Sequence, residues 1–201
     1  MVNQGLVVSP FEYVMVLVSI VVGLAITHLL SAVAEGVHRL RGHGQPLSLD
    51  PVYSLWVGYV LTWLISFWWY EFNFQALRDE WTFGLYLFVI SFAILLFLLA
   101  AILVPHRLNG VQDSYQYFME GRRWFFGANI VGVIFDVFDT LLKGAGYSAL
   151  PAAMWMSGVY VLASVAGLVS SRRTVQLLAA ATSFTLQLVY MFQQLGVLGD
   201  Q

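Results

Sequence analysis

The chain has 201 residues, of which 60% are hydrophobic and only 10% are charged, and its formal net charge is −2. Soluble globular domains carry roughly 25% charged residues, so this composition excludes an ordinary water-soluble protein. The absence of cysteine excludes disulfides, thiolate metal sites and cysteine nucleophiles. With no basic excess, the chain is not expected to bind nucleic acid.

Long stretches without Asp, Glu, Lys or Arg dominate the sequence. Five stretches have no charged residue, and a sixth, 124–142, has Asp136 and Asp139 as its only charged residues. A bilayer core about 30 Å thick is crossed by about 20 helical residues, so each stretch is long enough to span it. We therefore predict an all-α, polytopic integral membrane protein, a six-transmembrane-helix bundle that forms a single membrane domain over residues 1–201. The uncharged stretches are 13–34, 51–70, 81–105, 144–171 and 174–199.

Local signals place the ends of these helices. Asp50 followed by Pro51 is typical of an N-cap with proline at the first helical position, and Pro105 is expected to end the third helix. The aromatic segment 113–121 is expected to lie along the inner interface, ahead of the fourth helix. The predicted helices are 11–34, 51–72, 82–104, 123–143, 150–170 and 174–197.

Basic residues predict the orientation of the bundle, because Lys and Arg accumulate in short cytoplasmic loops. Seven of the nine fall in the first, third and fifth loops, and only Arg78 and Lys143 fall in the second and fourth. We expect a multi-pass protein of a bacterial-type inner membrane, with the N-terminus and the C-terminus outside. The seven inner residues are Arg39, Arg41, Arg107, Arg122, Arg123, Arg172 and Arg173.

Acidic residues within the expected membrane region are the strongest functional signal, since each costs about 2.5–3.5 kcal/mol at mid-membrane. Asp136 and Asp139 lie three residues apart and therefore share a face of the fourth helix. In the expected orientation, Glu12 begins the first helix and Glu71 ends the second at the same outer level. If these faces converge, they form an acidic transport site together with Lys143.

A structural role is the alternative for the same residues. Asp139 and Lys143 are four residues apart and can form an ion pair, Glu71 can pair with Arg78, and Glu12 can lie among the headgroups. The two interpretations have similar weight at this level.

Four further residues are possible secondary members of the site. Gln187, Tyr190 and Gln194 fall on one side of the sixth helix at outer depth. His28 lies inside the first helix, but haem bound by two histidines needs a second one at matching depth, and the other histidines fall in inner loops or at helix ends. We therefore expect no cofactor and no metal, with His28 in a hydrogen-bonded helix contact.

Two enzyme families with six membrane helices do not fit the chain. Rhomboid-like intramembrane proteases need a Gly-x-Ser-Gly serine and a later histidine, whereas this chain has Met156-Ser157-Gly158 and no histidine after His106. The aspartate array of a phosphatidyl-alcohol transferase is also missing. We expect a protein that is not an enzyme.

Three functional hypotheses follow. The first is a small channel or permease for protons or cations, with Asp136 and Asp139 as the intramembrane site. The alternative is a non-catalytic accessory or scaffold subunit of a larger membrane complex that binds lipid or a partner protein. The third is a membrane enzyme or redox protein that uses His28. Small-residue faces at Ser19/Gly23/Thr27 and Ala163/Gly167/Ser171 predict close helix packing and, more weakly, a homo-oligomer.

Overall fold

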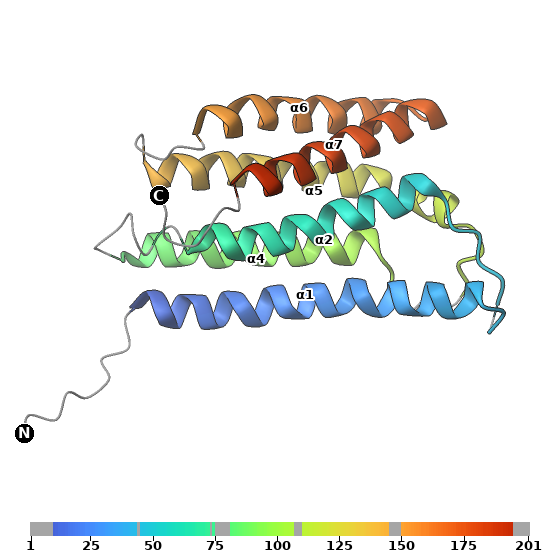
Figure 1. Cartoon of the computed structure of the whole chain (residues 1–201), viewed down its shortest axis with the longest axis horizontal. Coiled ribbons are helices and arrows are strands. Elements are labelled where there is room, and N and C mark those ends of the chain that lie inside the picture. The colour runs from blue at the N-terminus through green and yellow to red at the C-terminus, as the bar shows by residue number, and fades with distance from the viewer. Residues whose placement is uncertain are drawn as a thin grey trace, which may run out of the picture.

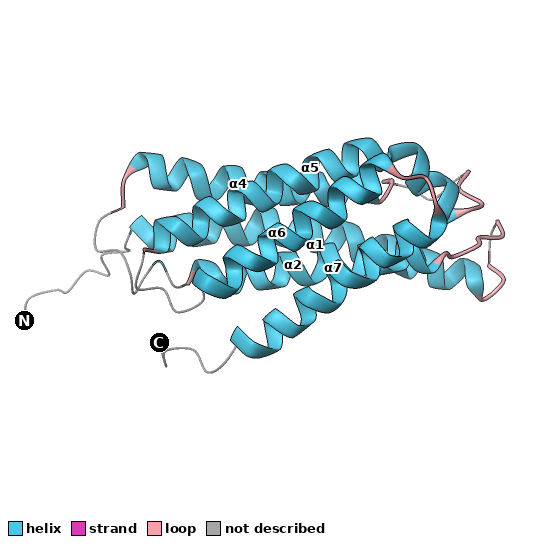
Figure 2. Cartoon of the chain, turned by 90° about the horizontal axis from the view of Figure 1, so that it is seen from above, coloured by secondary structure: helices cyan, strands magenta, loops and turns pink. Residues whose placement is uncertain are grey.

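The computed structural model describes residues 10–43, 45–72, 74, 81–106, 110–144 and 150–194. Within this part the chain forms six α-helices, which all run along the long axis of the molecule (Figures 1 and 2). This confirms the predicted all-α fold. The helices are α1 (Pro10–Leu40), α2 (Pro51–Glu71), α4 (Phe83–Leu103), α5 (Ser114–Lys143), α6 (Leu150–Val169) and α7 (Arg173–Gln194).

Five of the six helices are long and apolar enough to cross a membrane. In α6 the described apolar stretch is shorter, Met154–Val169, although the helix itself has 20 residues. Exposed leucine, valine, isoleucine and phenylalanine side chains cover the outside of the bundle, as expected for a surface in contact with lipid. The chain is a multi-pass helical membrane protein.

The helices are arranged in a closed order in which α2 has a central place. Going around the bundle, neighbours follow the order α1, α4, α5, α6, α7, α2 and back to α1, and α2 also contacts α4 and α5. Its buried aromatic residues fill the interior: Trp56 packs edge-to-face on Phe125 and Phe126 of α5, with ring centroids 5.0 and 5.4 Å apart. The core of the bundle therefore lies along α2.

Connections α1–α2, α4–α5 and α6–α7 meet at one end of the bundle, and the start of α1 and the end of α7 lie at the opposite end (Figure 1). Asp50 connects α2, α5 and α7 at the first of these ends. It caps α2 by accepting a hydrogen bond from the Val52 backbone at 2.8 Å, as predicted, and its own backbone N–H donates to Ser114 Oγ at 2.8 Å. Its other carboxylate oxygen pairs with Arg173 at the start of α7.

Two helices extend beyond their predicted ends. α1 continues through Gly36 to Leu40 rather than ending at residue 34, and Glu35 stabilises this last part by pairing with Arg39 one turn later at 2.7 Å. The segment expected at the interface, 113–121, is instead the start of α5: Asp113 caps the helix by accepting from Tyr115 N at 2.8 Å and from Gln116 N at 3.2 Å. α5 therefore begins nine residues before the predicted position 123.

Candidate functional site

A buried cluster of three charged residues joins the last turns of α2 and α5. The Lys143 ammonium forms an ion pair with Asp139 one turn earlier on α5 and lies 3.5 Å from Glu71 Oε1 on α2. The side chains of Lys143 and Glu71 are each 1% exposed, and that of Asp139 is 7% exposed. We call Glu71, Asp139 and Lys143 the charged cluster.

Helix geometry explains how the cluster forms. Glu71 is the last residue of α2 and Lys143 the last residue of α5, and the two helices run in the same direction along the bundle (Figure 1). The four-residue spacing of Asp139 and Lys143 places them on one face of α5. Phe74 covers the ammonium, with its ring centroid 4.6 Å from Nζ, which adds a cation–π contact.

Each carboxylate of the cluster keeps one oxygen without a hydrogen-bond partner. These atoms are Glu71 Oε2 and Asp139 Oδ1, and both are fully buried. Two carboxylates facing one ammonium leave a formal excess of one negative charge. Buried charge without compensation is costly, so one further positive charge would be stabilised when both carboxylates are ionised.

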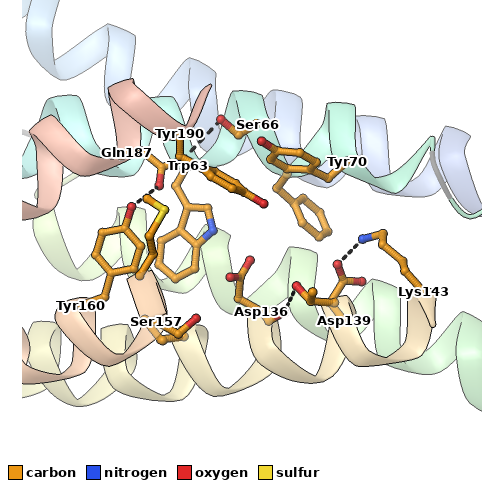
Figure 3. A pocket seen from close by; sticks show the side chains of 14 residues that line it. Trp63, Ser66, Tyr70, Asp136, Asp139, Lys143, Ser157, Tyr160, Gln187 and Tyr190 are labelled. Atoms are coloured by element: carbon orange, nitrogen blue, oxygen red, sulfur yellow. Dashed lines mark hydrogen bonds and ion pairs between the residues drawn. The ribbon is translucent and has the colours of Figure 1, made fainter. Parts of the chain in front are cut away.

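Asp136 lies one turn deeper on α5 and lines a small cavity beside the cluster (Figure 3). The cavity measures about 30 Å³, whereas a single water molecule needs roughly 10–15 Å³ of such space. It therefore accommodates one or two water molecules. Its walls come from α2, α5, α6 and α7: Trp63, Ser66, Phe67, Tyr70, Val133, Asp136, Asp139, Thr140, Lys143, Met156, Ser157, Tyr160, Gln187 and Tyr190.

Trp63 and Gly132 together shape the wall next to Asp136. The indole nitrogen of Trp63 points toward the Asp136 carboxylate (Figure 3). Gly132 lies one turn before Asp136 on the same face of α5, and a Cβ there would be only 2.8 Å from Trp63 Cη2. The glycine thus provides the space that lets the indole approach the carboxylate.

Polar side chains continue from this cavity across α2, α6 and α7. The Tyr160 hydroxyl donates to Gln187 Oε1 at 3.1 Å, and Gln187 Nε2 donates to Ser66 Oγ at 3.4 Å. Ser66 in turn donates to the Thr62 backbone carbonyl at 2.8 Å. These hydrogen bonds connect α2, α6 and α7 in the wall of the cavity that Asp136 also lines (Figure 3).

Deeper in the bundle the line of buried polar groups reaches toward the basic end. Asn129 Nδ2 donates to Ser164 Oγ at 2.8 Å, and Ser164 Oγ donates to the Tyr160 carbonyl at 2.7 Å. Ser183 and Gln176 of α7 are also fully buried, and Gln176 donates to the Ser170 carbonyl at 2.7 Å. We call these buried polar residues the polar seam: Tyr160, Ser164, Asn129, Ser183 and Gln176.

The structure brings together most of the residues singled out from the sequence. Asp136, Asp139, Glu71, Lys143, Gln187 and Tyr190 all belong to the cavity or the charged cluster. The expected pairing of Asp139 with Lys143 is confirmed, and Lys143 is also the partner of Glu71. Arg78, the alternative partner, lies outside the described residues.

Two of the singled-out residues, Glu12 and His28, lie elsewhere. Glu12 is exposed on α1 and borders a shallow groove with Trp68 and Phe72, so it does not join the other carboxylates. His28 makes a hydrogen bond with the Val104 carbonyl at 2.9 Å across to the end of α4, as expected for a helix contact. The side chain of Gln194 lies outside the described residues.

Several cavity residues were not recognised from the sequence. The most informative are Tyr160 and Ser157, which lie on α6 with Ser164 one turn beyond Tyr160. Polar residues at positions 157, 160 and 164 form a stripe on an otherwise apolar helix, and this helical spacing is the signal that would have found them. Trp63 stands out in the sequence only as one of several aromatic residues of α2, for which ordinary helix packing is the expected role.

In comparisons with protein-family models, with curated proteins and with solved structures, nothing matches this chain. Among the described residues, no three His, Asp or Glu side chains are arranged to hold a metal ion.

Proposed function

We propose that the protein is a small proton channel or permease, in which Asp136 is the group that receives and releases the proton. One observation carries the proposal: Asp136 lines a water-sized cavity between the buried charged cluster and the polar seam. Ionisable residues inside the membrane are costly and typically mark ion pathways. A carboxyl group that lines a cavity large enough for water, together with hydroxyl groups, suits proton transfer.

Cavity size favours a proton over a larger substrate. A space of about 30 Å³ is far below the roughly 300–1,000 Å³ typical of sites for organic ligands. A proton needs only a water molecule or a side chain that can both accept and donate. Tyr and Ser hydroxyls have this capacity, and Tyr160, Ser66 and Ser164 supply them.

Proton flux into liposomes tests the proposal directly. Purified protein is reconstituted with a pH-sensitive dye inside, and a potassium gradient with valinomycin supplies the driving potential. We expect flux with the wild type and its loss with Asp136→Asn, which keeps the shape of the side chain but cannot exchange a proton. Glu120→Gln is the matched control, because Glu120 is an exposed carboxylate on the same helix that accepts a hydrogen bond from Gln116 at 3.1 Å. Equal flux from Asp136→Asn and wild type would contradict the proposal.

We also propose the sidedness of the protein: the basic end faces the cytoplasm of a bacterial-type inner membrane, with both termini outside. The support is the gathering of Arg39, Arg122 and Arg173 at the end where the first, third and fifth connections meet, together with the cytoplasmic preference of such residues. Asp136 and the charged cluster then lie in the outer half of the membrane.

A second candidate function is that of an accessory subunit that packs against another membrane helix or a second copy of the chain. The observation that favours it is the small-residue face of α1. Ser19, Gly23 and Thr27 are exposed, and a Cβ on Gly23 would meet no atom within 4 Å. By contrast, Gly167 of the corresponding face on α6 packs directly on Phe126. Close approach of helices along small residues drives association in lipid.

Native mass measurement in nanodiscs tests this second candidate. Wild-type protein is expected to show oligomers or a larger complex, and Gly23→Leu is expected to reduce them to single chains. Gly158→Leu, at an exposed glycine on α6, serves as the control. Single chains for wild type across a wide concentration range would exclude the second candidate.

A further inference from the structure

We propose that Lys143 makes the site selective for protons by occupying the place in which a metal cation would otherwise bind. This inference rests on the proton conduction proposed above and names the residue that sets its specificity. Its basis is the position of the ammonium between two buried carboxylates from different helices.

The surroundings of Lys143 resemble what a small monovalent cation would require. Glu71 Oε1 and an Asp139 oxygen face the ammonium, and the Phe74 ring lies 4.6 Å from Nζ. Carboxylate oxygens are the preferred ligands of hard cations. The titratable groups that line the cavity beside Lys143 come from four helices: Tyr70 of α2, Asp136 and Asp139 of α5, Tyr160 of α6 and Tyr190 of α7.

The ammonium has an advantage over any free cation, because it is attached to the same helix as Asp139. A tethered group acts at a high effective concentration, and the four-residue spacing already places it on the correct face. A sodium or potassium ion would have to displace this group from both carboxylates and leave it buried without either of them. That loss opposes metal binding at the site.

A proton can enter without displacing Lys143. Glu71 Oε2 and Asp139 Oδ1 are buried and have no hydrogen-bond partner, so each can take a proton while its other oxygen stays on the ammonium. The formal excess of one negative charge in the cluster is then neutralised. The arrangement leaves room for one proton but not for the several oxygen ligands of a metal ion.

Thermal stability in matched salts tests this inference without relying on flux. Wild type and Lys143→Gln are compared in sodium chloride and in choline chloride at equal ionic strength, at several pH values from about 6 to 9. The midpoint temperature of thermal unfolding of the wild type is expected to be the same in both salts. The midpoint of Lys143→Gln is expected to rise with sodium in a saturable way, by about 3 °C or more, because ligand binding to the native state stabilises it.

Two further variants identify where the sodium binds. Adding Asp139→Asn or Glu71→Gln to Lys143→Gln is expected to remove the sodium response, because each deletes one of the two carboxylates. Glu120→Gln in the same background is expected to leave the response intact. A folded Lys143→Gln protein that shows no sodium response at any pH would overturn the inference.

Sodium uptake by the wild-type protein gives a second test, which does not depend on the folding of a variant. Liposomes containing it are expected to take up no radioactive sodium above the level of empty liposomes, and their proton flux is expected to be equal in sodium and choline. Sodium uptake by the wild type would overturn the selectivity inference. Absence of proton flux would overturn the proposed function, whereas the sodium response of Lys143→Gln is read independently of any flux.

Discussion

Single residues of one chemical type have very different surroundings in this protein. Glu71 is 1% exposed and contacts Lys143, whereas Glu12 is exposed on α1. Asp139 belongs to the charged cluster, and Asp136 lines the cavity one turn deeper. Position in the bundle, rather than residue type, therefore decides which carboxylates can take part in proton transfer.

Our first prediction compares the two glutamates. Glu71→Gln should lower proton flux by roughly tenfold or more, since the amide can still accept from Lys143 but carries no charge and cannot take up a proton. Glu12→Gln should leave flux close to that of the wild type, because the Glu12 side chain lies outside the cavity. The liposome assay measures both. A large effect of Glu12→Gln alone would contradict this prediction and favour the acidic site expected from the sequence, which includes Glu12.

A second prediction concerns two ion pairs that differ in burial. In sodium-free buffer, Lys143→Gln should lower the free energy of unfolding by about 3–5 kcal/mol, because it leaves buried carboxylates without their cation. Arg173→Gln should cost only about 0–1 kcal/mol, since the Arg173 side chain is 66% exposed although it pairs with Asp50. Denaturant titrations in mild detergent give both values, and similar losses for the two variants would contradict the assignment of a buried cluster.

Helix by helix, the sequence predicts the spans better than the ends. Apolar stretches predicted every helix, because a long run without charge has no other stable form in lipid. The ends of α1 and α5 were missed for one reason: both helices continue into polar sequence at the basic end, where hydropathy no longer marks a boundary. There Asp113 and the Glu35–Arg39 pair stabilise helix instead.

The site was predictable only in part, for a related physical reason. Charged residues within apolar runs stand out, so Asp136, Asp139 and Lys143 were found. Contacts between helices depend on how each helix is rotated and which helices are neighbours, and a single sequence does not contain that information in readable form. The contact of Trp63 with Asp136 was therefore not predicted, although Gly132 opposite the indole provides the necessary space.

The third prediction addresses packing between α5 and α6. Gly167→Ala should lower the free energy of unfolding by about 1–3 kcal/mol, because its Cβ would overlap Cζ of the fully buried Phe126. Gly158→Ala on the same helix should be neutral or stabilising by up to about 1 kcal/mol, since no atom lies within 4 Å of the new Cβ. Unfolding of both variants in the same detergent measures the difference, and equal stabilities would show that α5 and α6 are less tightly packed.

For the molecule as a whole, the fourth prediction concerns its direction in the membrane. The natural chain has no cysteine, so a single introduced cysteine reports its own side without any background. Arg41→Cys, in the exposed α1–α2 connection, should react with a membrane-impermeant maleimide only after the cells are opened. Phe83→Cys, at the opposite end of the bundle and 76% exposed, should react in intact cells. The reverse pattern would place the acidic cavity in the cytoplasmic half.

The ion pair of Glu71 with Lys143 also affects how the nascent chain inserts into the membrane. These residues are 72 positions apart, so α2 leaves the ribosome well before α5. Until α5 arrives, Glu71 lacks the ammonium that it contacts in the finished bundle, and an uncompensated charge resists entry into lipid. The second helix therefore completes its insertion only as a partner of the fifth, and a nascent chain that stops before Lys143 should leave the end of α2 at the membrane surface.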